Sequence, residues 1–238
     1  MKEKLYTIAV NEAYRTDCEC PVCAMYQTLE KASIEYTMGP SYMEDDIREM
    51  TNKAGFCEKH IKQLYSNQNR LGLALMLSTH MEQVIKDLTP LTKTVPKSSG
   101  LLKKKEDKPV PTYIKKVEQS CFVCDHTNNI FERYLATILY LYRSEEEFRT
   151  LFKNSKGLCQ PHYARLYEMA EKEFNSSTYQ AFIQDINELY LTNAKRVLDD
   201  LTWFIDKFDY RYKDEPWKNS KDALPRAVQK LTGAIIEE

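Results

Sequence analysis

The feature that most constrains this chain is a pattern of cysteine and histidine that occurs twice in the same order. A Cys-x-x-Cys pair is followed by a Gly-x-Cys-x-x-His segment, and both segments return in the second half of the chain. The segments contain Cys20 with Cys23, Cys57 with His60, Cys121 with Cys124, and Cys159 with His162. Apolar positions between them keep the same register, such as Leu29 with Ile130 and Ile34 with Leu135. The agreement indicates an internal duplication.

Each copy supplies three thiolates and one imidazole, which are suitable donors for a tetrahedral structural zinc site. We therefore predict two zinc ions per chain. One set is Cys20, Cys23, Cys57 and His60, and the other is Cys121, Cys124, Cys159 and His162. Two antiparallel helices within a copy would return the chain to its starting point and bring the two pairs together. An iron–sulfur cluster is less favoured, because such clusters more often use four thiolates.

Scarce turn residues and helical periodicity predict an all-α fold. Only six glycines and nine prolines occur among 238 residues, which favours long helices over strands and turns. The predicted helices include 24–38, 42–53 and 70–88 in the first copy, and 124–142, 145–154 and 178–212 in the second. Capping boxes at Ser41-x-x-Glu44 and Ser144-x-x-Glu147 are predicted to start the two shorter helices. The fold is thus expected to be two duplicated helical modules, each pinned by a Cys3His metal site, with a long C-terminal helix.

The expected domains are a first helical zinc module at 1–90, a linker at 91–117, and a second module with a helical extension at 118–238. The linker is rich in proline, serine and lysine, including three adjacent lysines at 103–105. Such a stretch is typical of a solvated connector. A nucleic-acid contact is the alternative. It is disfavoured because the lysines are not interleaved with arginine or aromatic residues.

The composition is that of an ordinary globular chain. Apolar residues make up 42% and charged residues 29%, and the formal net charge is −1. No apolar run is long enough to span a membrane, and the N-terminal apolar stretch is too short for a secretory signal. We therefore expect a cytoplasmic protein, in which seven cysteines are better explained by metal than by disulfides.

Three further candidates have no counterpart in the other copy. Cys18 is either a bystander or an extra thiol beside the first site, serving as an alternative ligand or a redox sensor. His126 is either near the second site or on a solvated helix face, and His80 is expected to pack in an apolar stripe. The bystander interpretation is favoured for Cys18, because a lone cysteine usually behaves as a small buried apolar residue.

The paired motifs resemble those of an uncharacterised bacterial family. Its members carry CPxC, then G-[FL]-C-x-x-H some thirty residues later, and then the same pattern again. The resemblance covers roughly residues 15–170, and Phe122 replaces the usual proline in the second copy. It implies a helical fold and no particular activity.

The leading functional hypothesis is a non-enzymatic, zinc-stabilised scaffold that binds a protein partner or a second copy of itself. Closed tetrahedra leave no position for substrate, and the chain lacks HExxH, GxSxG and phosphate-loop motifs. The acidic clusters 44–46 and 145–147 are explained by helix starts. The alternative is a redox- or metal-responsive regulator in which thiolate oxidation ejects zinc. A thiol oxidoreductase is disfavoured, because the βαβ context of such CxxC enzymes is missing.

Overall fold

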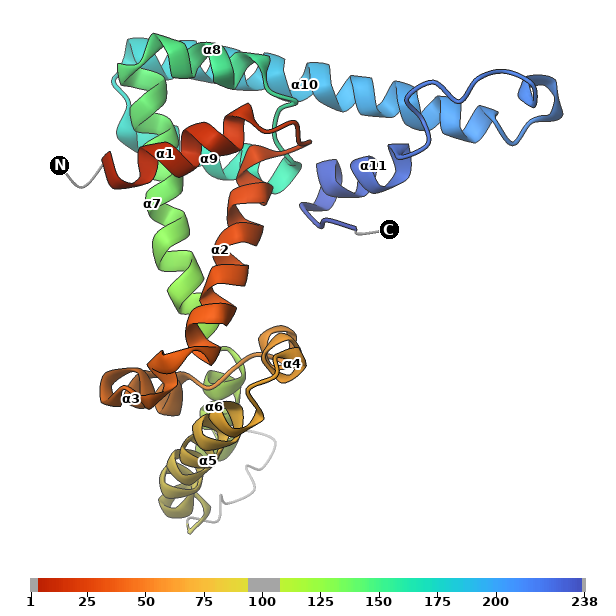
Figure 1. Cartoon of the computed structure of the whole chain (residues 1–238). Helices are drawn as coiled ribbons and strands as arrows, with labels where there is room; N and C mark the ends of the chain where they lie inside the picture. Colours follow the sequence, from red (N-terminus) through yellow and green to blue (C-terminus); the bar gives the residue numbers. More distant parts are fainter. Residues whose placement is uncertain (1–3, 94–107, 237–238) are drawn as a thin grey trace, which may run out of the picture. The chain divides into compact units, whose positions relative to one another are not determined.

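The computed structural model describes residues 4–93 and 108–236, in which all regular structure is helical (Figure 1). The α-helices are α1 Lys4–Arg15, α2 Pro21–Met38, α3 Asp45–Ala54, α4 Glu58–Ser66, α5 Arg70–Thr92, α6 Pro109–Glu118, α7 Phe122–Ser144, α8 Glu146–Asn154, α9 Gln160–Glu173, α10 Ser176–Asp206 and α11 Ala223–Thr232. Two short 3₁₀ helices, η1 Pro40–Met43 and η2 Tyr210–Tyr212, complete the described elements. The all-α prediction and the long helix near the C-terminus are confirmed.

The predicted capping boxes do not form. Helix α3 begins after Glu44 and α8 after Glu145, and neither residue makes a side-chain cap hydrogen bond. Ser41 instead lies in η1, because the chain after Pro40 makes a 3₁₀ turn before α3 starts. Ser144 ends α7 and donates a hydrogen bond of 2.8 Å to the carbonyl of Tyr140. The short helices exist where expected, but local turns rather than capping boxes set their starts.

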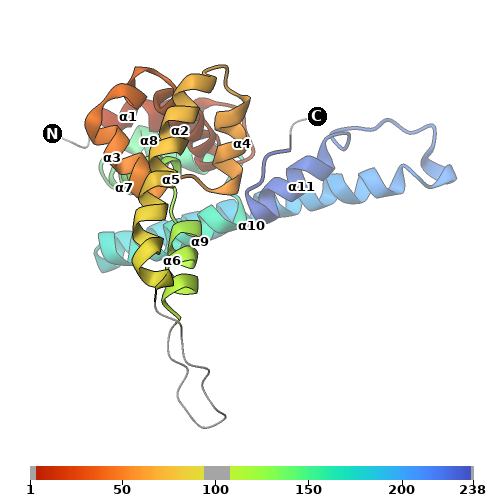
Figure 2. The ribbon, with the colours of Figure 1, turned by 90° about the horizontal axis from the view of Figure 1, so that it is seen from below.

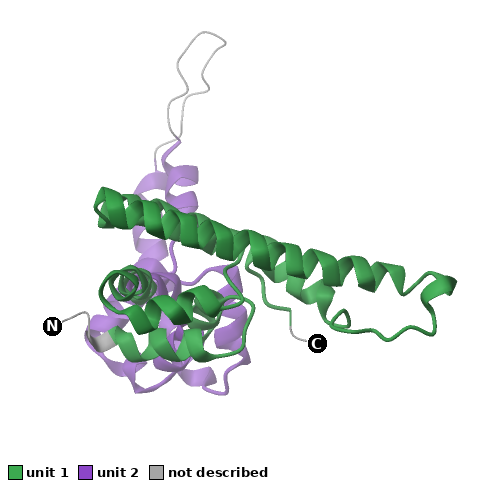
Figure 3. Ribbon diagram, turned by 90° about the horizontal axis from the view of Figure 1, so that it is seen from above, with its two compact units in different colours: residues 1–28, 130–238 green, residues 29–129 purple. Residues whose placement is uncertain are grey.

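The chain forms two compact units that do not follow the expected domain boundaries (Figure 3). Unit 1 combines residues 1–28 with 130–238, and unit 2 contains residues 29–129. The boundaries therefore fall inside α2 and α7, and each unit contains parts of both copies. Residues 94–107, the centre of the expected linker 91–117, lie outside the described residues, so the linker stays a prediction.

Unit 1 has an aromatic core built from four helices. Tyr14 of α1 lies edge-on to Phe148 of α8, with ring centroids 5.0 Å apart. Tyr142 of α7 meets Phe182 of α10 at 4.8 Å, and its hydroxyl donates to Asp185 at 2.6 Å. Helix α11 packs against α10 (Figures 1 and 2). These tyrosines line helix–helix seams, where their rings pack and the hydroxyl of Tyr142 has a hydrogen-bond partner.

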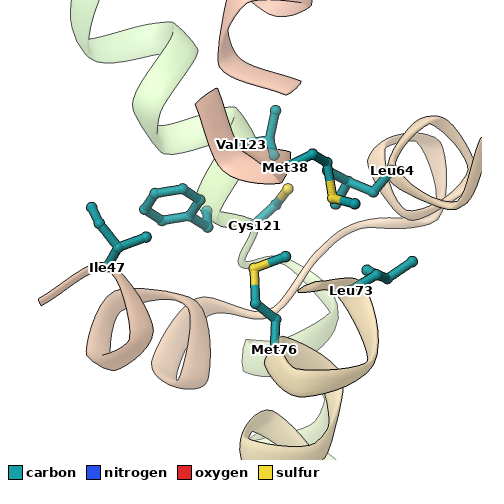
Figure 4. Packing of buried hydrophobic residues seen from close by; sticks show 8 residues of the cluster. Met38, Ile47, Leu64, Leu73, Met76, Cys121 and Val123 are labelled. Atoms are coloured by element: carbon teal, nitrogen blue, oxygen red, sulfur yellow. The ribbon is translucent and has the colours of Figure 1, made fainter. Parts of the chain in front are cut away.

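Unit 2 has an apolar core that includes Cys121 and lies beside the other candidate ligands. Met38, Ile47, Leu64, Leu73, Met76, Cys121, Phe122 and Val123 are buried together (Figure 4). Cys57 and Cys124 pack against this group as partly buried neighbours. The candidate ligands of unit 2 are therefore continuous with its hydrophobic core.

Among the described residues, no helix is long and apolar enough to cross a membrane.

Candidate metal centres

Every cysteine pair and Cys-x-x-His pair is placed at the N-terminus of a helix. The carbonyl of Cys20 accepts the first helical hydrogen bond of α2, and that of Cys121 accepts the first of α7. Cys57 and Cys159 are the N-cap residues of α4 and α9. The second residue of each pair therefore lies in the first helical turn. Helix N-termini favour negative charge, so all four segments present thiolates where the helix dipole stabilises them.

Cluster 1, in unit 1, consists of Cys20, Cys23, Cys159 and His162, whose donor atoms lie within 4.8 Å of one another. The Sγ atom of Cys23 is 3.5 Å from that of Cys159. The Nδ1 atom of His162 is 3.1 Å from the Sγ of Cys159 and 3.4 Å from that of Cys23. All three cysteines are buried. The cluster thus joins the N-termini of α2 and α9.

Cluster 2, in unit 2, consists of Cys57, His60, Cys121 and Cys124, again within 4.8 Å of one another. The Nδ1 atom of His60 lies 3.2 Å from the Sγ of Cys57 and 3.3 Å from each of the other two sulfurs. The Sγ atoms of Cys57 and Cys124 are 3.9 Å apart, and both residues are half-buried. This cluster joins the N-termini of α4 and α7.

The spacing of the donor atoms fits a tetrahedral metal ion. In a tetrahedron with bonds of about 2.1–2.3 Å, neighbouring donors lie about 3.4–3.8 Å apart. The Sγ atoms of Cys23 and Cys159 are 3.5 Å apart and those of Cys57 and Cys124 are 3.9 Å apart, and the sulfur–nitrogen distances range from 3.1 to 3.7 Å. Three thiolates with one imidazole suit a soft or borderline divalent cation. Both clusters can therefore hold a metal ion by donor type and by geometry.

Electrostatics also favours a cation in cluster 2. Burial alone would raise the pKa of Cys121, but hydrogen bonds from His60 and the backbone outweigh it and lower this pKa to about 6. Burial and the negative charge of Cys121 raise the pKa of Cys124 to about 12. One thiolate therefore opposes ionisation of its neighbour. A bound divalent cation removes that opposition, because it stabilises every thiolate it contacts.

Cluster 1 shows the same division between its thiols. Burial would raise the pKa of Cys20, but hydrogen bonds from Cys159, Cys23 and His162 outweigh it, and its pKa falls well below the usual value. Hydrogen bonds to Cys159 and Cys20, together with burial, raise the pKa of Cys23. A cation is again the physical means of ionising all three sulfurs together.

The eight predicted ligands are the residues that cluster, but the predicted grouping within each copy was wrong. Each cluster takes its Cys-x-x-Cys pair from one copy and its Cys-x-x-His pair from the other. The reason is helix length. Helix α2 has 18 residues and α3 has 10, so at 1.5 Å per residue α2 advances about 27 Å and α3 returns at most about 15 Å. Cys57 therefore lies beside the C-terminal half of α2 and not beside Cys20 and Cys23 at its N-terminus. The pair that Cys57 meets there is Cys121 with Cys124.

Sequence reasoning missed Glu30, which binds the histidine of cluster 2. Its Oε1 atom is 3.1 Å from the Nε2 of His60, and it also accepts a hydrogen bond from Lys59. The bond with His60 and that with Lys59 lower the pKa of Glu30 to about 2, against the opposing effect of burial. No motif in the sequence marks Glu30, and only a general rule of metal-site chemistry could have indicated a residue of its kind. A metal-bound histidine needs a partner for its second ring nitrogen, and a nearby carboxylate is a common one.

The C-terminal segment around cluster 1 was also missed. The carbonyl of Gly233 lies 3.6 Å from the Sγ of Cys23, and a Cβ on this glycine would lie 3.5 Å from the Sγ of Cys159. The buried Lys230 forms an ion pair of 3.2 Å with Glu19, the residue before Cys20. Burial lowers the pKa of Lys230, and the charges of Glu19 and Cys20 oppose that shift. The end of α11 thus covers cluster 1 and places a cation beside it.

The unduplicated candidates lie outside both clusters. Cys18 belongs to neither, and burial with the charge of Cys20 raises its pKa to about 11, which makes its thiol a poor nucleophile near neutral pH. His126 lies 3.0 Å from the hydroxyl of Ser33 and stacks on Tyr36. His80 lies 2.8 Å from the carbonyl of Asn52. The two histidines therefore have local structural contacts.

The fold and the site define an all-helical protein with two Cys3His clusters that can hold metal ions. The chain belongs to the family of unknown function DUF6062, whose model matches residues 1–238. No curated protein and no solved structure shows a significant match to the chain. The family assignment therefore adds no activity to what the site itself indicates.

The crossed grouping can be tested by asking which cysteines become reactive when one ligand is removed. In the variant Cys57→Ser, we expect Cys121 and Cys124 to become alkylated by a maleimide, because the metal that protects them is lost or loosened. Cys20 and Cys23 should stay protected. Alkylation of the native protein followed by peptide mass mapping measures this directly.

The reciprocal variant Cys159→Ser should expose Cys20 and Cys23 instead. Cys18→Ser is the control and should leave both clusters protected. Labelling of Cys20 and Cys23 in Cys57→Ser, with Cys121 and Cys124 unreactive, would restore the grouping within each copy.

Proposed function

We propose that this protein is a zinc-stabilised helical binding protein with two structural Cys3His sites, and that it is not an enzyme. The observation that carries the proposal is the closure of both clusters, each with four protein donor atoms within 4.8 Å of one another. A four-coordinate zinc with these ligands has no open position for water or substrate, which a catalytic zinc requires. Three thiolates also reduce the Lewis acidity of the ion.

The position of the clusters supports a structural role. Cluster 1 connects Cys20 with Cys159, and cluster 2 connects Cys57 with Cys121, so each ion would close a long loop of the chain. Each would also hold two helix N-termini together and compensate the negative charge of the thiolates that lie there. Zinc binding then contributes directly to the folding free energy, because the site does not exist in the unfolded chain.

The exposed acidic residues 44–46 and 145–147 have a structural explanation, so they do not require a catalytic role. Glu145 is the N-cap residue of α8, and Glu146 and Glu147 lie in its first turn. Glu147 forms an exposed ion pair of 3.1 Å with Arg15. Asp45 and Asp46 occupy the first turn of α3 in the same way. Carboxylates at these positions stabilise helix starts, and that role accounts for them without chemistry.

The proposal predicts two zinc ions per chain in protein purified without added metal. Removal of zinc by a strong chelator should abolish the cooperative thermal transition and most of the helical circular dichroism, since structural zinc in small modules contributes about 10 kcal/mol of binding free energy per site. Native mass spectrometry and elemental analysis give the stoichiometry. Cys18→Ser should keep both ions. Iron absorbance in the visible range, or a folded chain with no metal under reducing conditions, would refute the assignment.

A second part of the proposal is that the partner is another copy of this chain, docked along α10. Leu191, Leu198 and Ile205 recur at heptad spacing and are 65%, 59% and 63% exposed, and Phe208 continues the same stripe at 75%. Leu201, half-buried, lies between them. Apolar residues at this spacing on one helix fit between the side chains of a second helix. A contiguous apolar stripe on one surface is a common mark of a protein interface.

Self-association can be tested with a charge placed in that stripe. Wild-type protein should sediment as a dimer at micromolar concentration. Ile205→Glu should raise the dissociation constant about 100-fold, because burying an unpaired carboxylate costs about 3 kcal/mol. Ile8→Glu is the matched control, since Ile8 is 68% exposed on α1 of the same unit. A monomeric wild type at high concentration would contradict self-association and leave a different protein as the partner.

Cluster 2 supports a second candidate function, a redox-responsive regulator. Cys57 and Cys124 are half-buried with sulfurs 3.9 Å apart, whereas all three cysteines of cluster 1 are buried. Hydrogen peroxide is the oxidant class considered. One thiolate attacks a peroxide oxygen and breaks the O–O bond, which forms a sulfenic acid and releases hydroxide. The second thiolate attacks the sulfenic sulfur and displaces a second hydroxide, which forms a disulfide; each hydroxide takes a proton from solvent and becomes water. The two sulfurs lose two electrons, and the metal loses two ligands.

This candidate predicts that peroxide releases one zinc ion well before the other. Peptide mapping should place the first disulfide among Cys57, Cys121 and Cys124, because Cys57 and Cys124 are more accessible to peroxide than the buried cysteines of cluster 1. Zinc release is followed with a chromogenic chelator, and a reductant with added zinc should reverse it. Simultaneous loss of both ions, or a first disulfide within cluster 1, would exclude cluster 2 as a selective sensor.

A further inference from the structure

Glu30 connects helix α2 to the ligand helix of cluster 2. Its side chain is 11% exposed and contacts three residues of α4. It lies 3.1 Å from the Nε2 of His60, accepts a hydrogen bond from Lys59, and lies 3.5 Å from the amide nitrogen of Gln63. A buried carboxylate directed at a histidine ring from a neighbouring helix constrains both the rotation and the position of that ring.

The two nitrogens of His60 have separate roles in this geometry. Nδ1 faces all three sulfurs of cluster 2, so it is the atom that would bind a metal. Nε2 then carries the proton, and this N–H donates a hydrogen bond to Glu30. A carboxylate at this position fixes the tautomer and increases the electron density at the metal-binding nitrogen. Glu30 therefore acts on the metal through the histidine without contacting the metal.

The duplicated position in the other copy does not carry a carboxylate. Glu30 follows Cys23 by seven positions, and Phe131 follows Cys124 by the same seven. The corresponding ring contact is also present, because the Phe131 ring lies against the ring of His162 with centroids 5.5 Å apart. The two clusters thus share their donor set and helix geometry, but the residue that supports each histidine is a carboxylate in one and an apolar ring in the other.

We propose that Glu30 is a positioning residue for the metal of cluster 2, where it holds His60 in its metal-binding tautomer and slows release of the ion. Because Phe131 takes its place at cluster 1, the duplicated clusters are functionally unequal. The inference rests on the zinc proposal above and deepens it. It attributes the slow release of metal from cluster 2 in part to a residue that is not one of the four ligands.

The experiment measures zinc release from the full chain into an excess of chromogenic chelator. We expect two kinetic phases of one ion each. Glu30→Gln keeps the size and one acceptor but removes the charge, and should accelerate one phase about 10-fold. Glu30→Ala should accelerate it up to about 100-fold, since loss of a carboxylate that supports a metal-bound histidine typically costs 10–100-fold in affinity. The other phase should not change. Alkylation during the fast phase should label Cys121 and Cys124.

Glu35→Gln is the matched control, because Glu35 is an exposed carboxylate on the same helix. It should leave both phases unchanged. Nitrogen-15 NMR of the histidine side chains gives a readout that general destabilisation does not mimic. The Nε2 proton of His60 should be protected from exchange in the wild type and exposed in Glu30→Ala.

Equal acceleration of both phases by Glu30→Gln, or no change in either Glu30 variant, would overturn the role of Glu30 while leaving the zinc proposal intact. Absence of bound zinc in the wild type would instead overturn the zinc proposal, and the role of Glu30 with it.

Discussion

The convergence of three sulfurs and one imidazole within a few ångströms is the constraint on which both units depend. Thiolates this close, with sulfurs 3.5 Å apart between Cys23 and Cys159 and 3.9 Å apart between Cys57 and Cys124, repel one another unless a cation lies among them. The chain places these donors at helix N-termini, where partial positive charge offsets some of the repulsion. In unit 2 the candidate ligand Cys121 is also part of the hydrophobic core. A metal ion held there would therefore be coupled directly to core packing, and loss of either would be expected to undo the other.

Each cluster connects segments that are remote in the sequence and belong to different copies. This crossing has an energetic consequence, because an ion that closes a long loop restricts the unfolded chain more than one that closes a short loop. It also means that neither copy contains a complete site. A fragment with only the first copy would hold Cys20, Cys23, Cys57 and His60, yet these four residues lie in two different clusters of the intact chain.

The two clusters differ in what surrounds them more than in their ligands. Cluster 1 is covered by Gly233 and accompanied by the buried ammonium of Lys230, which compensates negative charge. Cluster 2 is partly open at Cys57 and Cys124, and a carboxylate supports its histidine. A closed site shields its thiolates from solvent, whereas an accessible one exposes them to oxidants and competing chelators. Duplication thus left the donors unchanged while their environments diverged.

The sequence by itself determined the helical class, the eight candidate ligands and the approximate helix positions. These depend on local properties: Cys and His spacing, the scarcity of glycine and proline, and apolar periodicity. The tertiary structure alone decided which pairs meet and that Glu30 supports His60. Periodicity gives the length of a helix but not the direction in which the chain leaves it. Because α3 is too short to retrace α2, Cys57 meets Cys121 and Cys124 rather than Cys20 and Cys23.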